Sequence, residues 1–111
     1  MATGIFKNTK VSGAVTSGSG STLYTVPSGK YAVIHSIYIT NTYNLEDLYV
    51  NIIIDDGAGN EFHVAYLYPV QANLGATLER PINLNDGEIV KVKASRANSL
   101  DVVVNVLEFT P

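Results

Sequence analysis

The chain has no cysteine and no tryptophan, and only 15% of its 111 residues are charged. Without cysteine there are no disulfides, no thiolate metal ligands and no cysteine nucleophile, so stability must come from packing or assembly. The charged fraction is well below the usual quarter, while 46% of the residues are hydrophobic. We therefore expect much of the surface to be neutral, as in a protein that buries surface against neighbours.

Basic charge is scarce as well, because 7 lysines and arginines face 10 acidic residues and give a formal net charge of -3. This balance supplies no positive field for phosphates, so nucleic-acid binding has no electrostatic support. No apolar run approaches the roughly 18 to 20 residues that span a bilayer. The opening residues also lack the charged and apolar regions of a signal peptide. We expect a soluble chain that binds neither nucleic acid nor membrane.

Short segments rich in Val, Ile, Thr and Tyr recur between clusters of Gly, Asn, Asp and Pro, and no segment shows a capped helical period. The pattern predicts an all-β fold, a single antiparallel β-sandwich domain over residues 1–111 with about eight short strands. The expected strands are 6–11, 23–26, 31–41, 48–55, 62–68, 76–84, 89–94 and 101–109. A jelly-roll-like connectivity is the preferred interpretation, with other Greek-key connections left open by pattern alone.

Two of these strands are irregular. In segment 31–41 neither face is uniformly apolar, and a β-bulge near His35 and Ser36 reconciles the two faces. The residues that this bulge would turn inward are Ala32, Ile34, Ile37 and Ile39. Pro81 interrupts segment 76–84, which it should confine to a sheet edge or split at a bulge.

Alternation assigns the faces of four other strands. The residues expected to point inward are Leu48, Val50, Ile52, Ile54, Val90, Val92, Val102, Val104 and Val106. Those expected to point outward are Tyr49, Asn51, Ile53, Lys91 and Lys93. A further set should share one face of its strand: Phe62, Val64, Tyr66 and Tyr68.

The first expected strand, 6–11, is weak because Lys7, Asn8 and Lys10 leave it little apolar character. The Gly/Ser-rich connection 17–21 follows it. Residues 1–21 are therefore a candidate N-terminal arm with a flexible connection. The arm either lies on its own subunit or reaches onto a neighbour.

No pattern of catalytic or metal-binding residues is present. The two histidines, His35 and His63, lie inside expected strands without a second ligand at metal-site spacing. No nucleophile elbow accompanies them. The loop 55–61 contains two aspartates, an asparagine and a glutamate, a composition that suits calcium. Its spacing differs from that of an EF-hand, and a hairpin connection requires the same residues, so we assign no catalytic, cofactor or metal site.

Seven tyrosines are the most informative enrichment, because tyrosine combines apolar contact area with a polar tip and is common where surfaces meet. Tyr43 lies in the expected loop 41–47, and Tyr49 points away from the inward face of its strand. We identify Tyr43 and Tyr49 as candidate partner contacts, which would touch a protein or stack on a sugar ring. The competing interpretation is that they are ordinary, partly buried surface residues.

Six segments that cover most of the chain carry a family resemblance. They are 1–8, 23–30 (LYTVPSGK), 32–34, 36–42, 87–95 (GEIVKVKAS) and 101–104. In these segments the chain resembles small virion structural proteins of tailed bacteriophages. The family has no catalytic residues to carry over.

The resemblance implies a non-enzymatic role in the virion, assembled in the host cytoplasm. The preferred hypothesis is a capsid decoration (cement) protein whose partners are the major capsid protein or other virion proteins and further copies of itself, a trimer being one option. A tail or neck accessory subunit is the first alternative. A carbohydrate- or receptor-binding β-sandwich is the second, because such folds commonly present aromatic side chains to sugars.

Overall fold

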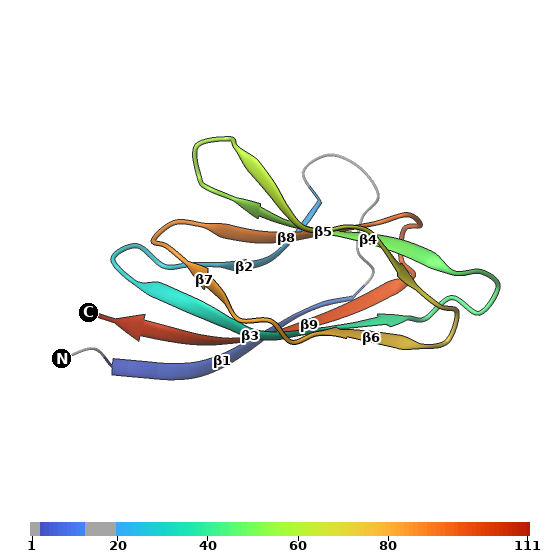
Figure 1. The fold of residues 1–111 in the computed structure, drawn as a ribbon, viewed down its shortest axis with the longest axis horizontal. Helices are drawn as coiled ribbons and strands as arrows, with labels where there is room; N and C mark the ends of the chain where they lie inside the picture. Colours follow the sequence, from blue (N-terminus) through green and yellow to red (C-terminus); the bar gives the residue numbers. More distant parts are fainter. Residues whose placement is uncertain (1–2, 13–19) are drawn as a thin grey trace.

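In the computed structural model, residues 3–12 and 20–111 are described, and within them there are nine strands and no helix. The strands form two facing layers (Figure 1). They are β1 (Thr3–Ser12), β2 (Ser21–Thr25), β3 (Tyr31–Asn41), β4 (Leu48–Asp55), β5 (Glu61–Val70), β6 (Gly75–Leu78), β7 (Ile82–Leu84), β8 (Ile89–Ala94) and β9 (Leu100–Thr110). None of the described segments is a helix long and apolar enough to cross a membrane.

The two layers are antiparallel sheets with interleaved strand orders. Sheet A has the order β1-β9-β3-β6, with β7 also paired to β3, and sheet B has the order β2-β8-β4-β5. With β6 and β7 counted as one interrupted strand, eight strands are divided four and four in the arrangement of a double-sheet jelly roll. The predicted β-sandwich is therefore confirmed, and the connectivity that the sequence left open is a jelly roll.

Both predicted irregularities are present. The register of β3 against β9 shifts between Ile34 and Ser36, which is the expected bulge. The four residues that it was expected to turn inward are all buried: Ala32, Ile34, Ile37 and Ile39. The segment containing Pro81 is split as predicted, because β6 and β7 pair with successive parts of β3. This split accounts for the ninth strand.

The core lies between the two sheets. The valines of β9 predicted to point inward are buried, and so are Val90 and Val92 on β8 and Leu48, Val50 and Ile52 on β4. Ile54 is partly buried against the same cluster. Alternation alone therefore located most of the core.

Two residues on the outward face of sheet B are more buried than the sequence predicted. Ile53 is 2% exposed and Lys91 is 9% exposed, although both point away from the core. Ile53 has Lys91 and His63 as its partners on the two neighbouring strands. The apolar stem of a lysine can cover a neighbouring side chain, so an outward position here does not mean an exposed one.

The prediction of one continuous face for β5 is wrong. Its register against β4 shifts twice, so that Val50 pairs with Tyr68 while Ile52 pairs with Ala65. Alternation is broken at these shifts, and Tyr66 projects into solvent at 66% exposure while Tyr68 packs against the core. Phe62 remains exposed. The loop between β4 and β5, which precedes it in the chain, projects at the top of Figure 1.

The predicted weak first strand is an edge strand. β1 pairs along its whole length with β9, from Thr3 opposite Thr110 to Ser12 opposite Asp101. Thr9 Oγ1 also donates to the Leu23 carbonyl oxygen at 2.5 Å and so joins β1 to β2. The other residues of the predicted arm before Gly20, residues 1–2 and 13–19, lie outside the described ranges, and the reach of the arm onto a neighbour stays a prediction.

Candidate interaction surfaces

The outward side of sheet A is a broad face without charged side chains over most of its length. Cross-strand pairs fix which residues share it, because directly opposed residues point to the same side of a sheet. We call it the neutral face. Its members are Phe6, Asn8, Tyr31, Val33, Ser36, Tyr38, Val103, Asn105, Leu107 and Phe109.

One end of the neutral face is built from aromatic rings. Tyr31 and Phe109 are stacked with ring centroids 5.0 Å apart and an interplanar angle of 14°. A Cβ at Gly4 would lie 3.3 Å from both Leu107 Cδ1 and Phe109 Cε1. Glycine at position 4 therefore lets these two side chains lie close over β1, which makes a continuous apolar surface across two strands.

The middle of the neutral face is hollowed where β3 bulges. The hollow has a volume of about 520 Å³, and its lining residues are Phe6, Lys7, Asn8, His35, Ser36, Tyr38, Asn105 and Val106. Asn105 Nδ2 donates to Ser36 Oγ at 3.0 Å across its floor. Phe6 stands at its edge with 78% of its surface exposed. The hollow thus combines hydrogen-bonding side chains with an aromatic rim, and Lys7, which is paired with Glu108, contributes the one charged group to its lining.

A buried carboxylate joins the sheets behind the neutral face. Glu108 on β9 is 2% exposed and accepts a hydrogen bond from the Tyr24 hydroxyl at 2.6 Å. Its other oxygen lies 2.9 Å from Lys7 Nζ and 3.3 Å from Lys30 Nζ. The Tyr24 hydrogen bond and the two ammonium groups lower the pKa of Glu108, against the opposing effect of burial. Burial, and then Glu108 itself, raises the pKa of Tyr24.

Sequence reasoning missed this cluster, although one signal for it was present. The alternation that turns Val102, Val104 and Val106 inward turns Glu108 inward as well. Its partners come from β1, β2 and the turn before β3, and no local pattern brings them together. The cluster is a structural tie that holds the edge strand β1 to the sandwich.

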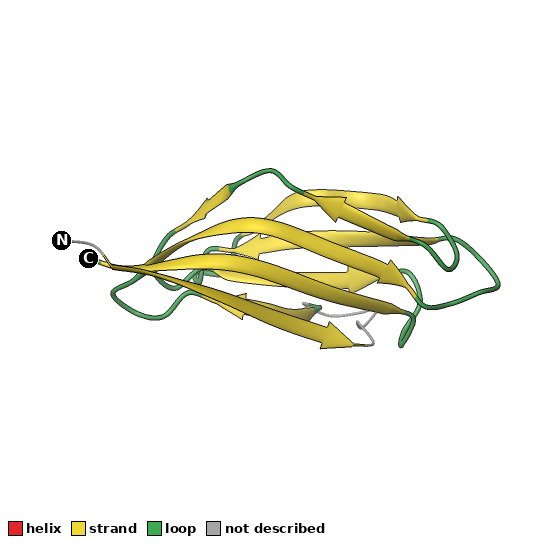
Figure 2. Cartoon of the chain, turned by 90° about the horizontal axis from the view of Figure 1, so that it is seen from below, coloured by secondary structure: helices red, strands yellow, loops and turns green. Residues whose placement is uncertain are grey.

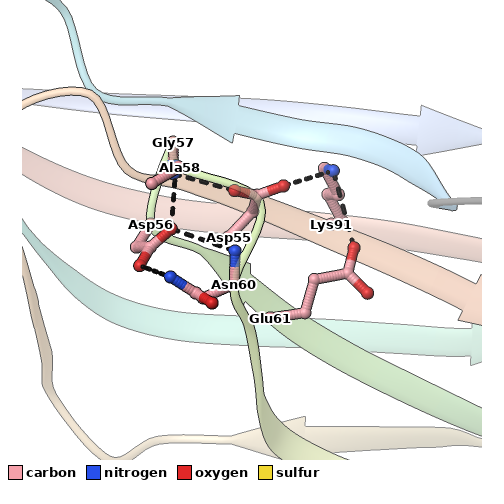
Figure 3. A network of polar contacts seen from close by, with 7 residues as sticks. All are labelled: Asp55, Asp56, Gly57, Ala58, Asn60, Glu61 and Lys91. Carbon is pink, nitrogen blue, oxygen red and sulfur yellow. Dashed lines mark hydrogen bonds and ion pairs between the residues drawn. The ribbon is translucent and has the colours of Figure 1, made fainter.

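The loop between β4 and β5 holds a second polar network (Figure 3). Lys91 Nζ lies 2.8 Å from Asp55 Oδ2 and 3.7 Å from Glu61 Oε2. The Lys91 ammonium, and after it the Gly57 amide, lowers the pKa of Asp55, and the same contact raises the pKa of Lys91.

Within the same loop Asp56 organises the turn. It accepts hydrogen bonds from the Asn60 side chain at 2.9 Å and from the Ala58 amide at 2.8 Å, and both contacts lower its pKa. Among the described residues there is no group of three or more His, Cys, Asp or Glu placed to hold a metal ion. The carboxylates that suggested calcium thus serve as acceptors for turn amides and for Lys91.

Tyr49 is exposed on the outward side of sheet B. Its side chain is 48% exposed and shares a shallow pocket with Leu67. Leu67 occupies the second irregularity of β5 with a φ of 51°, and its amide donates to Asn51 Oδ1 at 2.7 Å. A positive φ is unfavourable for a branched residue, so the surrounding contacts hold this side chain outward. We call Tyr49, Tyr66 and Leu67 the bulge patch.

Tyr43 has a different environment. It is partly buried against the core cluster, and Arg96 Cζ lies 4.1 Å from the centre of its ring. Its amide donates to Asn41 Oδ1 at 2.8 Å. Tyr43 therefore has a structural role in its loop, and only the remaining part of its ring is open to a partner.

The two tyrosines should respond differently to truncation. Tyr43→Ala is expected to lower the free energy of unfolding by about 1–2 kcal/mol, because it removes packing and a cation–π contact. Tyr49→Ala should change stability by less than about 0.5 kcal/mol, because the side chain is largely exposed. Urea denaturation followed by circular dichroism measures both. Equal losses for the two variants would contradict these assignments.

The histidines are not brought together with other ligands among the described residues. His63 lies opposite Ile53 and so faces away from Phe62, as the sequence predicted. Its ring meets Tyr66 edge-on with centroids 5.0 Å apart. His35 is exposed at the hollow in the neutral face.

No protein-family model matches the chain, and no curated protein matches it significantly. Among solved structures, a chain of the acidic stable capsid structure of Helicobacter pylori bacteriophage KHP30 is 17% identical with a TM-score of 0.61, and the match covers 100% of this chain and 94% of that one. A chain of the infectious bursal disease virus Gx strain is 9% identical with a TM-score of 0.53, covering 99% of this chain and 38% of that one. For the T13 particle of infectious bursal disease virus the identity is 11%, the TM-score 0.51 and the coverage 96% and 35%.

These similarities establish a shared fold. The fold described above occurs in chains from a phage capsid structure and from structures of infectious bursal disease virus. This chain matches the phage chain over nearly its full length, whereas it spans little more than a third of the infectious bursal disease virus chains.

Proposed function

We propose that the protein is a non-enzymatic structural subunit of a bacteriophage virion, and specifically a capsid decoration (cement) protein. The observation that carries the proposal is the match to a chain of a phage capsid structure over 100% of this chain and 94% of that one. The sequence resemblance to small virion proteins points in the same direction. The partners would be the major capsid protein and further copies of this chain.

The surface chemistry supports such a role. Large apolar side chains are exposed on the outward sides of both sheets, including Phe6 on sheet A and Tyr49 and Leu67 on sheet B. A decoration protein adds buried interface across joins between capsid subunits. Each contact is modest, and the symmetry of the shell multiplies it because the partners are already fixed in place.

We assign the contact with the capsid to the bulge patch. Tyr49 and Leu67 are exposed side by side around a shallow pocket, and the hydrogen bond from the Leu67 amide to Asn51 fixes that pocket's shape. Rigid aromatic and aliphatic side chains lose little conformational entropy on binding. Tyr43 contributes the open part of its ring as a secondary contact.

Particles that lack the protein should lose resistance to heat and to low salt. The expected result is release of the packaged genome at a lower temperature than from complete particles, measured by dye access to DNA during heating. Adding purified protein back should restore resistance, and Tyr49→Ala should weaken rebinding by about tenfold or more, the usual cost of truncating an interface anchor. Phe62→Ala serves as an exposed aromatic control outside the bulge patch.

Equal heat resistance with and without the protein would contradict the cement role. Electron microscopy of particles carrying labelled protein then separates the alternatives. Label over the whole head supports decoration, whereas label confined to the tail or neck contradicts it and favours an accessory subunit.

A further inference from the structure

We infer that the neutral face of sheet A is the surface through which this chain binds a second copy of itself. Figure 2 looks onto this face, and no described segment crosses it. Of its members, Phe6 is 78% exposed, Tyr38 43% and Tyr31 40%. An uncharged face that exposes several large aromatic side chains on a small domain marks an interaction site.

The size of the face matches what an interface between two proteins requires. β9 runs for 11 residues, and the neutral face on β1, β9 and β3 is continued onto the fourth strand position by the uncharged Thr77 of β6 and Asn83 of β7. At about 3.3 Å per residue and about 4.8 Å between strands, the outward side of sheet A measures about 36 by 19 Å, or about 700 Å². Stable interfaces bury about 800 Å² on each partner.

The distribution of charge favours a neutral partner. Between the Tyr31–Phe109 stack and Tyr38 the neutral face has no charged member, and the charge of Lys7, which lines the hollow, is paired with Glu108. Lys10 and Asp101 stand only at its far end. An apolar centre with charge at the rim is the usual anatomy of a protein interface. The exposed apolar residues of β5 differ, because Glu61, Glu79 and Arg80 lie near them.

The shape of the neutral face, with a projection beside a hollow, favours a second copy of the same chain as the binding partner. Phe6 protrudes beside a hollow of about 520 Å³ floored by the Ser36–Asn105 hydrogen bond. One surface therefore offers both the projection and the recess that would receive it. A surface that carries both complementary elements can pair with itself, and its partner has the same neutral chemistry.

The test is the oligomeric state of the isolated protein, measured by sedimentation velocity over a range of concentrations. The wild type is expected to self-associate below about 100 μM. Phe6→Ser and Tyr38→Lys should each raise the dissociation constant by about tenfold or more. Salt near 1 M should not weaken association, because the central contacts are uncharged.

Two matched variants control for the loss of any exposed aromatic side chain. Phe62→Ser removes a phenylalanine that is 59% exposed on β5, and Tyr49→Lys places a charge on the outward side of sheet B. Both should associate like the wild type. Far-UV circular dichroism verifies that all four variants retain the β-sheet spectrum, which is expected because each altered side chain is substantially exposed.

Three results would overturn the inference. The first is a wild type that stays monomeric at about 100 μM. The second is association that persists unchanged in both Phe6→Ser and Tyr38→Lys. The third is a monomer that binds a neutral glycan and loses that binding in Tyr38→Lys, which would assign the hollow to a sugar. The inference rests on the proposed function only in that a virion subunit would use this contact on the particle. Self-association is measured on the isolated protein, so a negative result here is distinguishable from a failure of the virion experiments.

Discussion

Replacing Glu108 with glutamine is expected to lower the free energy of unfolding by about 2 kcal/mol at neutral pH, since hydrogen bonds to charged groups contribute about 1.5–3 kcal/mol. Glu108 is 2% exposed. It accepts a hydrogen bond from the Tyr24 hydroxyl and forms ion pairs with Lys7 and Lys30. Glutamine keeps the size of the side chain but removes the charge that holds two ammonium groups beside it. Urea denaturation of the wild type and of Glu108→Gln at pH 7 measures the difference.

The difference between these two proteins should depend on acid pH in a defined direction. The folded-state pKa of Glu108 is lowered, so its contribution to stability is complete above the unfolded pKa, about 4.3, and is lost as pH falls through the folded value. The stability advantage of the wild type over Glu108→Gln should therefore be constant from pH 7 to about pH 5 and shrink below about pH 4. Comparison of the two curves removes the effect of the other carboxylates.

The control for this result is Glu79→Gln, which removes the same charge from an exposed position. Its stability should follow that of the wild type at every pH. Parallel curves for the wild type and Glu108→Gln down to pH 3 would show that folding does not lower the pKa of Glu108, against the assignment made above.

At alkaline pH the Tyr24 hydroxyl reports on the same contact. Its folded-state pKa is raised above the usual tyrosine value of about 10, so its contribution is complete below pH 10 and is lost as pH rises through the folded value. The tyrosinate absorbance of the folded wild type should therefore equal that of folded Tyr24→Phe, because the Tyr24 hydroxyl stays protonated in the folded protein.

Patterns within single strands were sufficient to predict much of the fold. The conflict between two apolar faces in β3 located the bulge at His35 and Ser36, and Pro81 located the division between β6 and β7. These predictions succeeded because each depends on the period of one strand and on the backbone limits of one residue.

Features that depend on neighbouring strands were not predictable in the same way. Ile53 is buried on an outward face because Lys91 and His63 flank it, and Lys91 is separated from Asp55 by 36 positions. The irregularities of β5 occur without glycine or proline at Tyr66 and Leu67, so no turn residue marks them.

The candidate surfaces likewise include one feature that a single strand predicts and one that depends on the order of the strands. Tyr49 was predicted to point outward, and it does, with 48% exposure. The neutral face could not be predicted, because Phe6 belongs to a strand of little apolar character and gains its neighbours only when β1 pairs with β9 and β9 with β3. The strand order supplies that information, and alternation does not.

Deleting Tyr38 is expected to have the largest effect of any change to one residue that we propose, a loss of about 3–6 kcal/mol out of the 5–15 kcal/mol typical of a domain. In β3 Ile34 is paired with Val106 and Ser36 with Asn105, and His35 is the extra residue of the bulge between these pairs. Without Tyr38, one part of β3 must shift by one position against β9, and a shift by one turns every side chain in that part to the opposite face.

Either shift damages the core. If the bulge is kept, Ile39 turns outward, and if the bulge is lost, Ile37 turns outward in its place, although each is 1% exposed in the wild type. Deletion of His35 is the matched control, because it removes only the extra residue and leaves the inward side chains of β3 in register, so it should cost about 1 kcal/mol or less. Urea denaturation measures both variants, and equal losses would contradict the assignment of His35 as the residue that β3 carries in excess of its pairing with β9.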